Sequence, residues 1–311
     1  MILDFIIVIL CIVGLSYGAT ILVDASARLA RRIGISELVI GLTVVAIGTS
    51  APEFAVTGLA AIRGQADISV GNVVGSNIFN LGFILGSVVA VRAVDTSRKM
   101  VFRDGSILVA AALALLFFMR DLELQRSEGF ILFGALILYV TYLIYQREET
   151  DEDVPEGEFQ WLDVVRLIGG IGLIILAGQY LVISATSIAR AWGVSEWVIA
   201  VTIIAAGTSA PEMATSLVAV LRGHTGISIG NLIGSSIFNL LGVLGLAGII
   251  QTAAAPLGID EAGQASLWMQ AGMFILVVIF MRSGWRLSGW EGIALIVINL
   301  LRWVFDFSAQ A

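Results

Sequence analysis

The chain alternates long apolar runs with short polar segments. Ten of the runs match a membrane-spanning helix, which needs about 20 largely apolar residues. We expect these helices at residues 3–30, 36–62, 68–91, 102–119, 127–146, 162–190, 195–221, 227–250, 267–282 and 289–306. The pattern therefore predicts an all-α polytopic membrane protein with ten transmembrane helices.

A hydrophilic stretch at 147–160 separates five of these helices from the other five. Because five is odd, the second set enters the membrane from the side opposite to the first. This predicts two inverted-topology five-helix repeats, at 1–146 and 161–311, with a substrate site near the membrane midplane between them. The stretch itself is dense in Asp and Glu, and its like charges predict a solvated linker.

The composition agrees with a membrane protein, because 58% of the residues are hydrophobic, 13% are charged and the mean hydropathy is +0.97. Lys and Arg gather on the cytoplasmic side of membrane proteins. With the N-terminus outside, 12 of the 17 Lys and Arg residues fall inside, since 17 − 5 = 12. The five outer ones are Arg63, Arg120, Arg126, Arg190 and Arg302. We therefore expect a multi-pass protein of the cell (plasma) membrane with both termini outside.

Two polar blocks occur twice within the apolar sequence. Gly-Thr-Ser-Ala-Pro-Glu occupies 48–53 and returns at 207–212, an interval of 212 − 53 = 159 residues. A second block, Gly-Asn-x-x-Gly-Ser followed by an Asn four residues on, occupies 71–80 and returns at 230–239 with the same interval. The equal intervals place the two blocks in register within the predicted repeats. The blocks correspond to repeat segments at about 36–91 and 195–250.

Each first block ends in a glutamate, Glu53 or Glu212, within a predicted spanning helix. A carboxylate at the bilayer centre costs roughly 2.5–3.5 kcal/mol on insertion scales, so such residues face polar cavities and mark ion paths. Pro52 and Pro211 have no N–H, which frees a carbonyl four residues earlier and opens the turn. Hydroxyl groups precede each glutamate by three and four residues, on its side of the helix: Thr49, Ser50, Thr208 and Ser209.

The second blocks predict a polar stripe on each partner helix, because their polar residues recur every four positions. The stripes consist of Asn72, Ser76 and Asn80, and of Asn231, Ser235 and Asn239. Glycines at the same spacing predict close helix packing: Gly71, Gly75, Gly230 and Gly234. Single polar residues in membranes usually bond across helices, so we read Asn72, Asn77 and Asn231 as interhelical contacts. We place Asn80 and Asn239 in the site.

Carboxylate, hydroxyl, amide and backbone carbonyl oxygens form a ligand set for a hard cation. Ca²⁺ takes about 6–8 oxygen ligands in a flexible shell, and Na⁺ is also bound by oxygen. Mg²⁺ gives up its water reluctantly, and Zn²⁺ normally recruits His or Cys. The chain has a single cysteine, Cys11, and a single histidine, His224, which we expect in a loop. The transported ion predicted by these residues is Ca²⁺.

These blocks resemble the α-repeats of the cation/calcium exchanger superfamily, and most closely its prokaryotic sodium/calcium exchanger branch. The resemblance implies ten helices in two inverted halves and alternating access, in which one Ca²⁺ exchanges for several Na⁺ as the first and sixth helices slide on a rigid core. It implies an ion site formed by Thr49, Ser50, Glu53, Ser76, Asn80, Thr208, Ser209, Glu212, Ser235 and Asn239, together with the backbone carbonyls of Ala46 and Ala205.

One position departs from part of that superfamily. Some archaeal and potassium-dependent members carry Asp at the position of Asn239, whereas this chain has Asn in both halves. The expected site therefore holds two formal negative charges, which one Ca²⁺ or two Na⁺ would neutralise. This makes potassium co-transport less favourable and leaves the Na⁺:Ca²⁺ ratio open.

Several functions remain open from the residues alone. Glutamates can be neutralised by protons as well as by Na⁺, so Ca²⁺/H⁺ antiport is the main alternative to Na⁺/Ca²⁺ exchange. A cation channel and a non-transporting scaffold are less favoured, because neither needs an inverted repeat. We expect no enzymatic activity, no cofactor, and no nucleic-acid or protein partner beside the bilayer and the ions. Asp24 has no acidic counterpart 159 residues on, and we expect it to pair with Arg28.

Overall fold

The computed structural model describes residues 1–146, 159–194, 199, 203, 205–251 and 257–308, so most of the acidic stretch and the start of the predicted helix 195–221 lie outside the described residues. The first half contains α1 Ile2–Ile33, α2 Glu37–Ile40, η1 Gly41–Val45, α3 Ala46–Thr49, α4 Ala51–Ile62, α5 Ala66–Phe79, η2 Asn80–Ile84, α6 Leu85–Val91, β1 Val94–Asp95, η3 Met100–Gly105, α7 Ser106–Phe118, η4 Met119–Asp121, β2 Glu123–Leu124 and α8 Arg126–Gln146. The second half contains α9 Leu162–Ala191, α11 Ala205–Thr208, α12 Ala210–Leu221, α13 Thr225–Ile237, η6 Phe238–Val243, α14 Leu244–Ile250, β3 Leu257–Gly258, α15 Glu261–Arg282, η7 Ser283–Trp285, β4 Arg286–Leu287 and α16 Gly289–Ser308.

Among the described residues, seven helices are long and apolar enough to cross a membrane, or eight if the bent pair Glu37–Thr49 and Ala51–Ile62 is one span. The seven are Ile2–Ile33, Ala66–Val91, Met100–Asp121, Arg126–Gln146, Leu162–Ala191, Thr225–Ile250 and Glu261–Trp285. The two other predicted ranges, 195–221 and 289–306, are helical in α11, α12 and α16. The all-helical, multi-pass class is confirmed, and the number of ten crossings stays a prediction.

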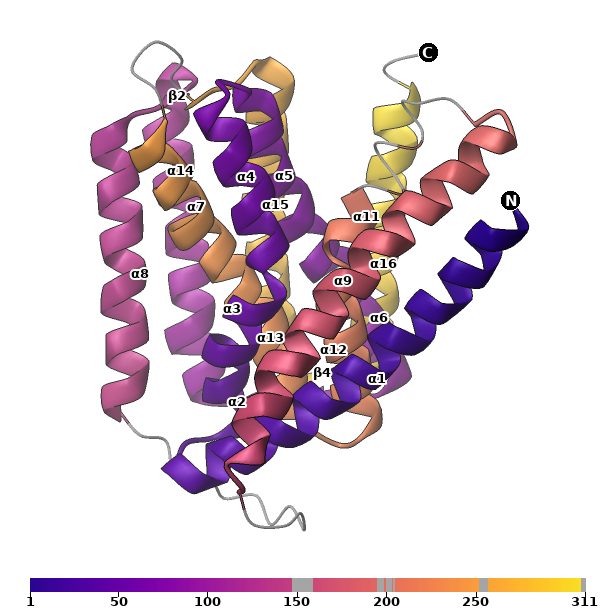
Figure 1. Cartoon of the computed structure of the whole chain (residues 1–311). Coiled ribbons are helices and arrows are strands. Elements are labelled where there is room, and N and C mark those ends of the chain that lie inside the picture. Colours follow the sequence, from indigo (N-terminus) through magenta and orange to yellow (C-terminus); the bar gives the residue numbers. More distant parts are fainter. Residues whose placement is uncertain (147–158, 195–198, 200–202, 204, 252–256, 309–311) are drawn as a thin grey trace. The chain divides into compact units, whose positions relative to one another are not determined.

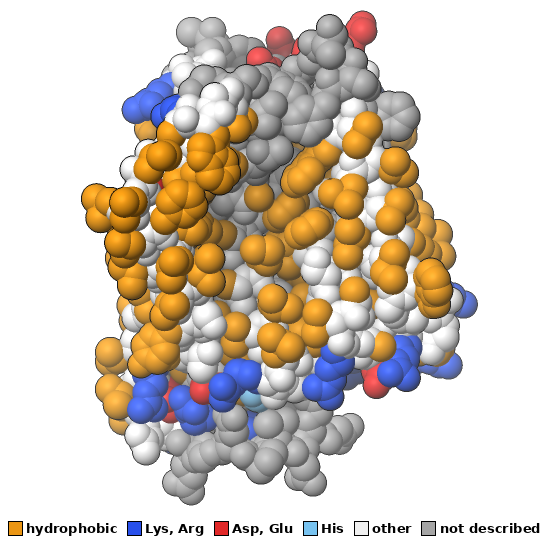
Figure 2. Space-filling view, turned by 90° about the vertical axis from the view of Figure 1, so that its right-hand side faces the viewer, with side chains coloured by type: hydrophobic (Ala, Val, Ile, Leu, Met, Phe, Trp, Pro, Cys, Tyr) orange, Lys and Arg blue, Asp and Glu red, His pale blue; other side chains and the backbone are white. Residues whose placement is uncertain are grey.

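Hydrophobic side chains cover most of the surface in one view, and Lys and Arg side chains gather toward one margin of it (Figure 2). On α1 the exposed side chains include Ile9, Leu10 and Val13, each more than half exposed. Exposed apolar area of this extent marks a surface that meets lipid. The surface thus agrees with a chain that resides in the bilayer.

The chain divides into two compact units, each drawn from both sides of the acidic stretch. Unit 1 comprises Met1–Pro52 and Tyr142–Gly234, and unit 2 comprises Glu53–Thr141 and Ser235–Ala311. The three boundaries fall inside α4, α8 and α13, so each of these helices contributes to both units.

Two long helices, α1 and α9, lie side by side in unit 1 (Figure 1). They are antiparallel, because Gly14 of α1 meets Ala177 of α9 while Gly18, one turn later, meets Gly170, which is earlier in α9. A Cβ on Gly18 would lie 3.2 Å from the carbonyl oxygen of Gly170, a tight contact, so glycine favours this close approach of the two backbones. Since α1 and α9 open the two halves of the sequence, corresponding helices run in opposite directions here.

A second close contact in unit 1 joins α2 and η1 to α13. A Cβ on Gly230 would lie 2.5 Å from the carbonyl oxygen of Leu38 and 3.0 Å from the Cα of Gly41. One turn later, a Cβ on Gly234 would lie 2.8 Å from the Cα of Leu42. The prediction of close helix packing at Gly230 and Gly234 is therefore confirmed.

Unit 2 is built by helix pairs that also meet at glycines. α16 packs on α6, where a Cβ on Gly86 would lie 2.7 Å from the carbonyl oxygen of Gly292. α8 meets α14 in the same way, because a Cβ on Gly129 would lie 2.8 Å from the carbonyl oxygen of Gly245. α15 packs against both α5 and α7. The small residues thus set how closely the helices around α5 approach one another.

Two short antiparallel β pairs in unit 2 link the halves of the sequence. β1 pairs with β4 through Val94 and Leu287, and β2 pairs with β3 through Leu124 and Leu257. β1 corresponds to β3, and β2 corresponds to β4, because both comparisons give the same interval: 257 − 94 = 163 and 287 − 124 = 163. The repeat therefore continues beyond the polar blocks, with four extra residues in the second half after Asn239.

The contact at Gly230 gives a direct stability test. Gly230→Ala should lower the melting midpoint of the detergent-solubilised protein, because overpacking against a rigid backbone costs about 1–3 kcal/mol. Gly172→Ala in α9 is the matched control, since no described atom lies within 4 Å of the added Cβ. Its midpoint should be unchanged or higher, because alanine favours helix over glycine by about 1 kcal/mol. Equal midpoints for the two variants would contradict the packing described here.

Candidate functional site

Both copies of the first polar block contain a helix break. α3 ends at Thr49, Ser50 adopts a turn conformation with φ −81° and ψ 5°, and α4 starts at Ala51, with a bend of 50° between the two helices. In the second copy, Ser209 has nearly the same conformation, φ −90° and ψ 8°, between α11 and α12. A proline two residues after each serine cannot donate to the preceding turn, which explains the break. The turn opening predicted from Pro52 and Pro211 is confirmed.

In unit 1 the break brings a hydroxyl group to a buried carboxylate. Ser50 Oγ donates to Glu212 Oε1 over 3.2 Å, and Glu212 has no exposed surface. Charge-assisted O–H···O⁻ bonds are usually about 2.5–2.7 Å long, so this contact is a weak one. Ser209 Oγ is buried and has no hydrogen-bond partner in the described chain. Ser209 thus offers a buried hydroxyl oxygen with no partner among the described residues.

Thr49, also in unit 1, is held by the partner helix α13. Its Oγ1 lies 2.9 Å from Asn231 Oδ1 and 3.4 Å from the carbonyl oxygen of Ala46, which also accepts the N–H of Ser50 at 3.0 Å. Asn231 in turn donates from Nδ2 to Ser216 Oγ at 2.9 Å. The predicted interhelical role of Asn231 is therefore confirmed, and it holds the Thr49 side chain beside the break.

In unit 2 the same chemistry surrounds the other glutamate. Ser76 Oγ of α5 donates to Glu53 Oε1 over 3.3 Å, and Glu53 is fully buried. Asn80 is also fully buried, and neither its Oδ1 nor its Nδ2 has a hydrogen-bond partner among the described residues. Asn239 donates from Nδ2 to Asn77 Oδ1 at 3.1 Å, while its own Oδ1 is buried and accepts no hydrogen bond in the described chain.

The two asparagines at the ends of the stripes lie in π-helical turns. η2 starts at Asn80, and η6 starts at Phe238, one residue before Asn239. π-helical turns inside α-helices are rare and occur frequently at functional sites. The sequence shows no periodicity that distinguishes a π turn from an α turn, so these two features were not predicted.

A second layer of hydrogen bonds supports both stripes in the same way. Asn72 Nδ2 donates to Thr57 Oγ1 at 3.0 Å, as Asn231 does to Ser216, and 216 − 57 = 159. Ser69 Oγ donates to the carbonyl oxygen of Thr57 at 3.1 Å, and Ser228 does so to that of Ser216 at 2.7 Å. These supporting hydroxyls were missed in the sequence, although each pair keeps the 159-residue interval that marked the site residues.

The predicted ligands are divided between the units. Unit 1 contains seven, namely Ala46, Thr49, Ser50, Ala205, Thr208, Ser209 and Glu212, and unit 2 contains five, namely Glu53, Ser76, Asn80, Ser235 and Asn239. Within the described residues, no three His, Cys, Asp or Glu side chains converge on a common point. A cation bound by these groups would therefore rely on neutral oxygens beside its carboxylates.

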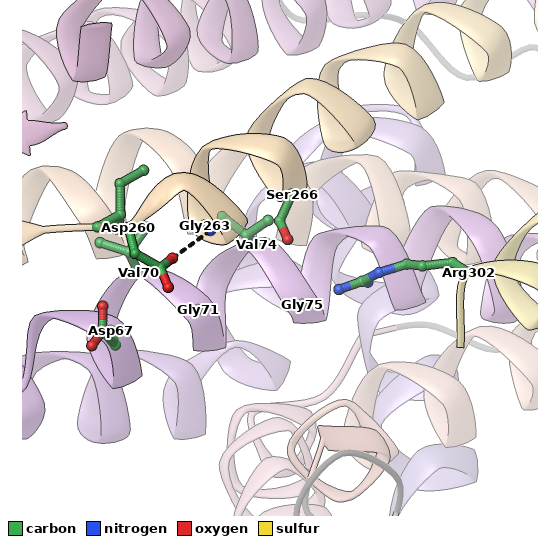
Figure 3. A pocket seen from close by; sticks show the side chains of 10 residues that line it. Asp67, Val70, Gly71, Val74, Gly75, Asp260, Gly263, Ser266 and Arg302 are labelled. Atoms are coloured by element: carbon green, nitrogen blue, oxygen red, sulfur yellow. Dashed lines mark hydrogen bonds between the residues drawn. The ribbon is translucent and has the colours of Figure 1, made fainter. Parts of the chain in front are cut away.

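The glycines on the helix of the first stripe have different surroundings from those on the helix of the second. Gly71 and Gly75 have no described atom within 4 Å of an added Cβ, and they line a cavity of about 320 Å³ in unit 2 between α5, α15 and α16. Asp67 and Asp260 lie toward one end of this cavity and Arg302 toward the other (Figure 3). The prediction of close helix packing was therefore wrong at Gly71 and Gly75, because an open space, not a described helix backbone, borders that face of α5.

Three further polar contacts in unit 1 involve none of the predicted ligands. His224 is a loop residue as predicted, but it is buried, and its Nδ1 lies 2.7 Å from Glu37 Oε1. Asp24 pairs with Arg222 at 2.9 Å, and Arg28 pairs with Asp163 at 2.8 Å. The expected contact between Asp24 and Arg28 stays a prediction.

Buried glutamates beside hydroxyl and amide oxygens are typical of cation transporters when they occur in a helical membrane protein. Comparison with known proteins identifies the family. The family model described as "Sodium/calcium exchanger protein" matches residues 3–145 and 162–305, so the chain belongs to the sodium/calcium exchanger family, whose members are cation/Ca²⁺ antiporters.

Individual relatives cover nearly the whole chain. CaxA of Alkalimonas amylolytica is 36% identical over 91% of this chain and 92% of its own length. The sodium/calcium exchanger MaX1 of Methanosarcina acetivorans is 30% identical over 94% of this chain and 95% of its own. Among solved structures, the sodium-calcium exchanger NCX_Mj, soaked with Na⁺ and Ca²⁺, matches with a TM-score of 0.84 at 27% identity and covers 97% of both chains.

The supporting asparagines can be compared directly. Asn231→Leu should lower the melting midpoint more than Asn72→Leu at the equivalent position. Asn231 is fully buried and bonds both Thr49 and Ser216, so its loss removes two buried hydrogen bonds, whereas Asn72 is half-buried and bonds Thr57 alone among the contacts described here. Leaving a buried polar group unpaired costs about 1–3 kcal/mol. A larger loss for Asn72→Leu in detergent melting curves would show that the supporting layer is not organised this way.

Proposed function

We propose that this chain exchanges Ca²⁺ for Na⁺ across the membrane by alternating access, with both ions using one set of oxygen ligands. The observation that carries the proposal is that Glu53 and Glu212 are each fully buried and each faces a serine hydroxyl of another helix, at 3.3 and 3.2 Å. A carboxylate enclosed within membrane helices beside such neutral oxygens favours a cation next to it.

The proposed ligands are the twelve residues that the sequence singled out. They are Ala46, Thr49, Ser50, Glu53, Ser76, Asn80, Ala205, Thr208, Ser209, Glu212, Ser235 and Asn239. The buried Oδ1 atoms of Asn80 and Asn239 and the buried Oγ of Ser209 support this set, because each lacks a hydrogen-bond partner in the described chain. The carbonyl oxygen of Ala46 accepts the backbone N–H of Ser50, and its second contact, with Thr49 Oγ1, is 3.4 Å long and would give way to an ion.

Two carboxylates make exchange the natural mode of transport. One Ca²⁺ or two Na⁺ neutralise their charge, whereas an empty site would leave two desolvated negative charges. An unloaded protein would therefore resist switching between its inward- and outward-open states, and bound ions would relieve that cost. Export and import of the two cations would then be coupled.

Inverted topology is part of the proposal. It is supported by the antiparallel packing of α1 and α9, by the matched hydrogen bonds to Thr57 and Ser216, and by the matched pairing of the four short strands. The family match to each half separately agrees with a repeat of this kind. Alternating access around a site between inverted repeats follows the general pattern of secondary transporters.

The glutamates provide the test of the transport function. In Na⁺-loaded proteoliposomes, Glu53→Gln and Glu212→Gln should each lower the initial rate of ⁴⁵Ca²⁺ uptake about 100-fold or more, because two charges 4 Å apart interact by about 4 kcal/mol at an effective dielectric constant of 20. Glu261→Gln is the control, since Glu261 is exposed at the start of α15. Uptake that survives both substitutions would refute the assignment of the site.

The same vesicles separate Na⁺ from H⁺ as the counter-ion. Uptake by the unsubstituted protein should follow an outward Na⁺ gradient at constant pH and should stop when the gradient is removed. If instead uptake persists without Na⁺ and follows a pH gradient, the protein is a Ca²⁺/H⁺ antiporter. Flux that requires no counter-ion would indicate a channel.

We also propose that the chain lies in the plasma membrane with both termini outside. In a Cys11→Ser background, Gln65→Cys lies in an exposed turn on the predicted outer side, and Arg32→Cys lies exposed at the end of α1 on the predicted inner side. A membrane-impermeant maleimide applied to intact cells should label the first variant alone. Labelling of only the second would reverse the orientation.

A further inference from the structure

We propose that Asn77 is a positioning residue for the ion site, because it orients the amide of Asn239 so that the oxygen of Asn239 is left for a cation. The inference rests on the proposed function in one respect only, namely that Asn239 contributes to a cation site. It goes beyond the sequence, which marked Asn77 as an interhelical contact and not as part of the site.

An amide and a carboxylate differ as ligands for a cation. A carboxylate presents an acceptor whichever way it is rotated, whereas an asparagine side chain has one end that accepts and one end that only donates. If the NH₂ group of Asn239 faced a cation, the interaction would be repulsive. An asparagine can therefore serve as a cation ligand only where something holds its NH₂ group elsewhere.

Asn77 is placed to do this. Its Oδ1 accepts a hydrogen bond of 3.1 Å from Asn239 Nδ2, and both residues are fully buried in unit 2. This bond uses the donor end of Asn239 and leaves its Oδ1 buried, with no hydrogen-bond partner in the described chain. The opposite rotation of both amides would also leave one hydrogen bond between them, because Asn77 Nδ2 has no partner among the described residues. A cation at Asn239 Oδ1 would select the rotation seen here, in which Asn77 Oδ1 accepts from the NH₂ group that points away from the cation.

The two halves of the chain differ at this point. Asn239 corresponds to Asn80, because 239 − 80 = 159, but the residue corresponding to Asn77 is Ser236, because 236 − 77 = 159. Neither amide atom of Asn80 has a hydrogen-bond partner among the described residues. Only one of the two site amides thus has a described acceptor for its NH₂ group. Pairing that group lowers the cost of turning the amide oxygen to a cation, so Asn239 should contribute more than Asn80 to cation affinity.

A double-mutant cycle distinguishes orientation from simple packing. Asn77→Leu keeps much of the side-chain volume but removes the acceptor, while Asn239→Asp supplies a side chain that needs no orientation. The readouts are the half-saturating Ca²⁺ concentration for uptake into Na⁺-loaded proteoliposomes and the Ca²⁺-induced rise in melting midpoint of the detergent-solubilised protein. Asn77→Asp is the conservative variant, because it keeps an oxygen that can accept from Asn239.

With Asn239 present, Asn77→Leu should raise the half-saturating Ca²⁺ concentration about tenfold, the size of effect expected when one hydrogen bond fixes a ligand. In the Asn239→Asp background, Asn77→Leu should raise the half-saturating Ca²⁺ concentration less than about threefold. Asn77→Asp should not raise this concentration in either background. A rise of equal size in both backgrounds would reduce Asn77 to a packing role, and no rise with Asn239 present would overturn the proposal as well.

The two readouts separate this inference from the transport function. If the unsubstituted protein shows no Na⁺-driven uptake, the proposed exchange is wrong, but the Ca²⁺-induced shift in melting midpoint still follows the same cycle if Asn77 orients Asn239. If uptake is Na⁺-driven and the cycle shows no coupling, the exchange stands and the role of Asn77 is rejected. Melting midpoints without Ca²⁺ identify any variant that has lost its fold.

Discussion

A carboxylate buried among apolar helices must be met by donors or by a cation, and the polar part of this protein follows from that constraint. A serine of another helix donates to each of Glu53 and Glu212, and the helix that carries each glutamate is broken one turn earlier. The break costs backbone hydrogen bonds, and asparagines and serines of the partner helices tie the surrounding turns together. The scaffold thus holds two buried carboxylates beside neutral oxygens, an arrangement that suits the cation site proposed above.

Much of this arrangement could be predicted because it depends on composition and spacing. The length of the apolar runs predicts helices to within a few residues of those described, such as α8 at Arg126–Gln146 against the expected 127–146. Pro52 and Pro211 predict the helix breaks through the chemistry of proline alone. Glu53 and Glu212 stand out because a charge in a spanning helix needs a reason.

The remainder depends on surroundings that the sequence does not contain. Gly71 and Gly230 occupy equivalent positions, yet one borders a cavity and the other touches the backbone of α2, because their neighbours differ. The π-helical turns at Asn80 and Asn239 change the hydrogen-bond register without changing the hydrophobic period. Thr57 and Ser216 were overlooked because a small hydroxyl residue in a membrane helix often only bonds its own backbone. Asn77 matters through the rotation of another residue, and no spacing rule reveals that.

The division into compact units has an evolutionary consequence. Each unit takes one segment from the first half of the chain and one from the second, so neither half forms a unit of its own. Each half therefore needs the other to complete a unit, as the copies of a domain-swapped pair do. If the two halves are inverted repeats as proposed, an ancestor half as long would have had to assemble as a pair to complete either unit. A single chain, unlike such a pair, can carry different residues at equivalent positions, as Asn77 and Ser236 show.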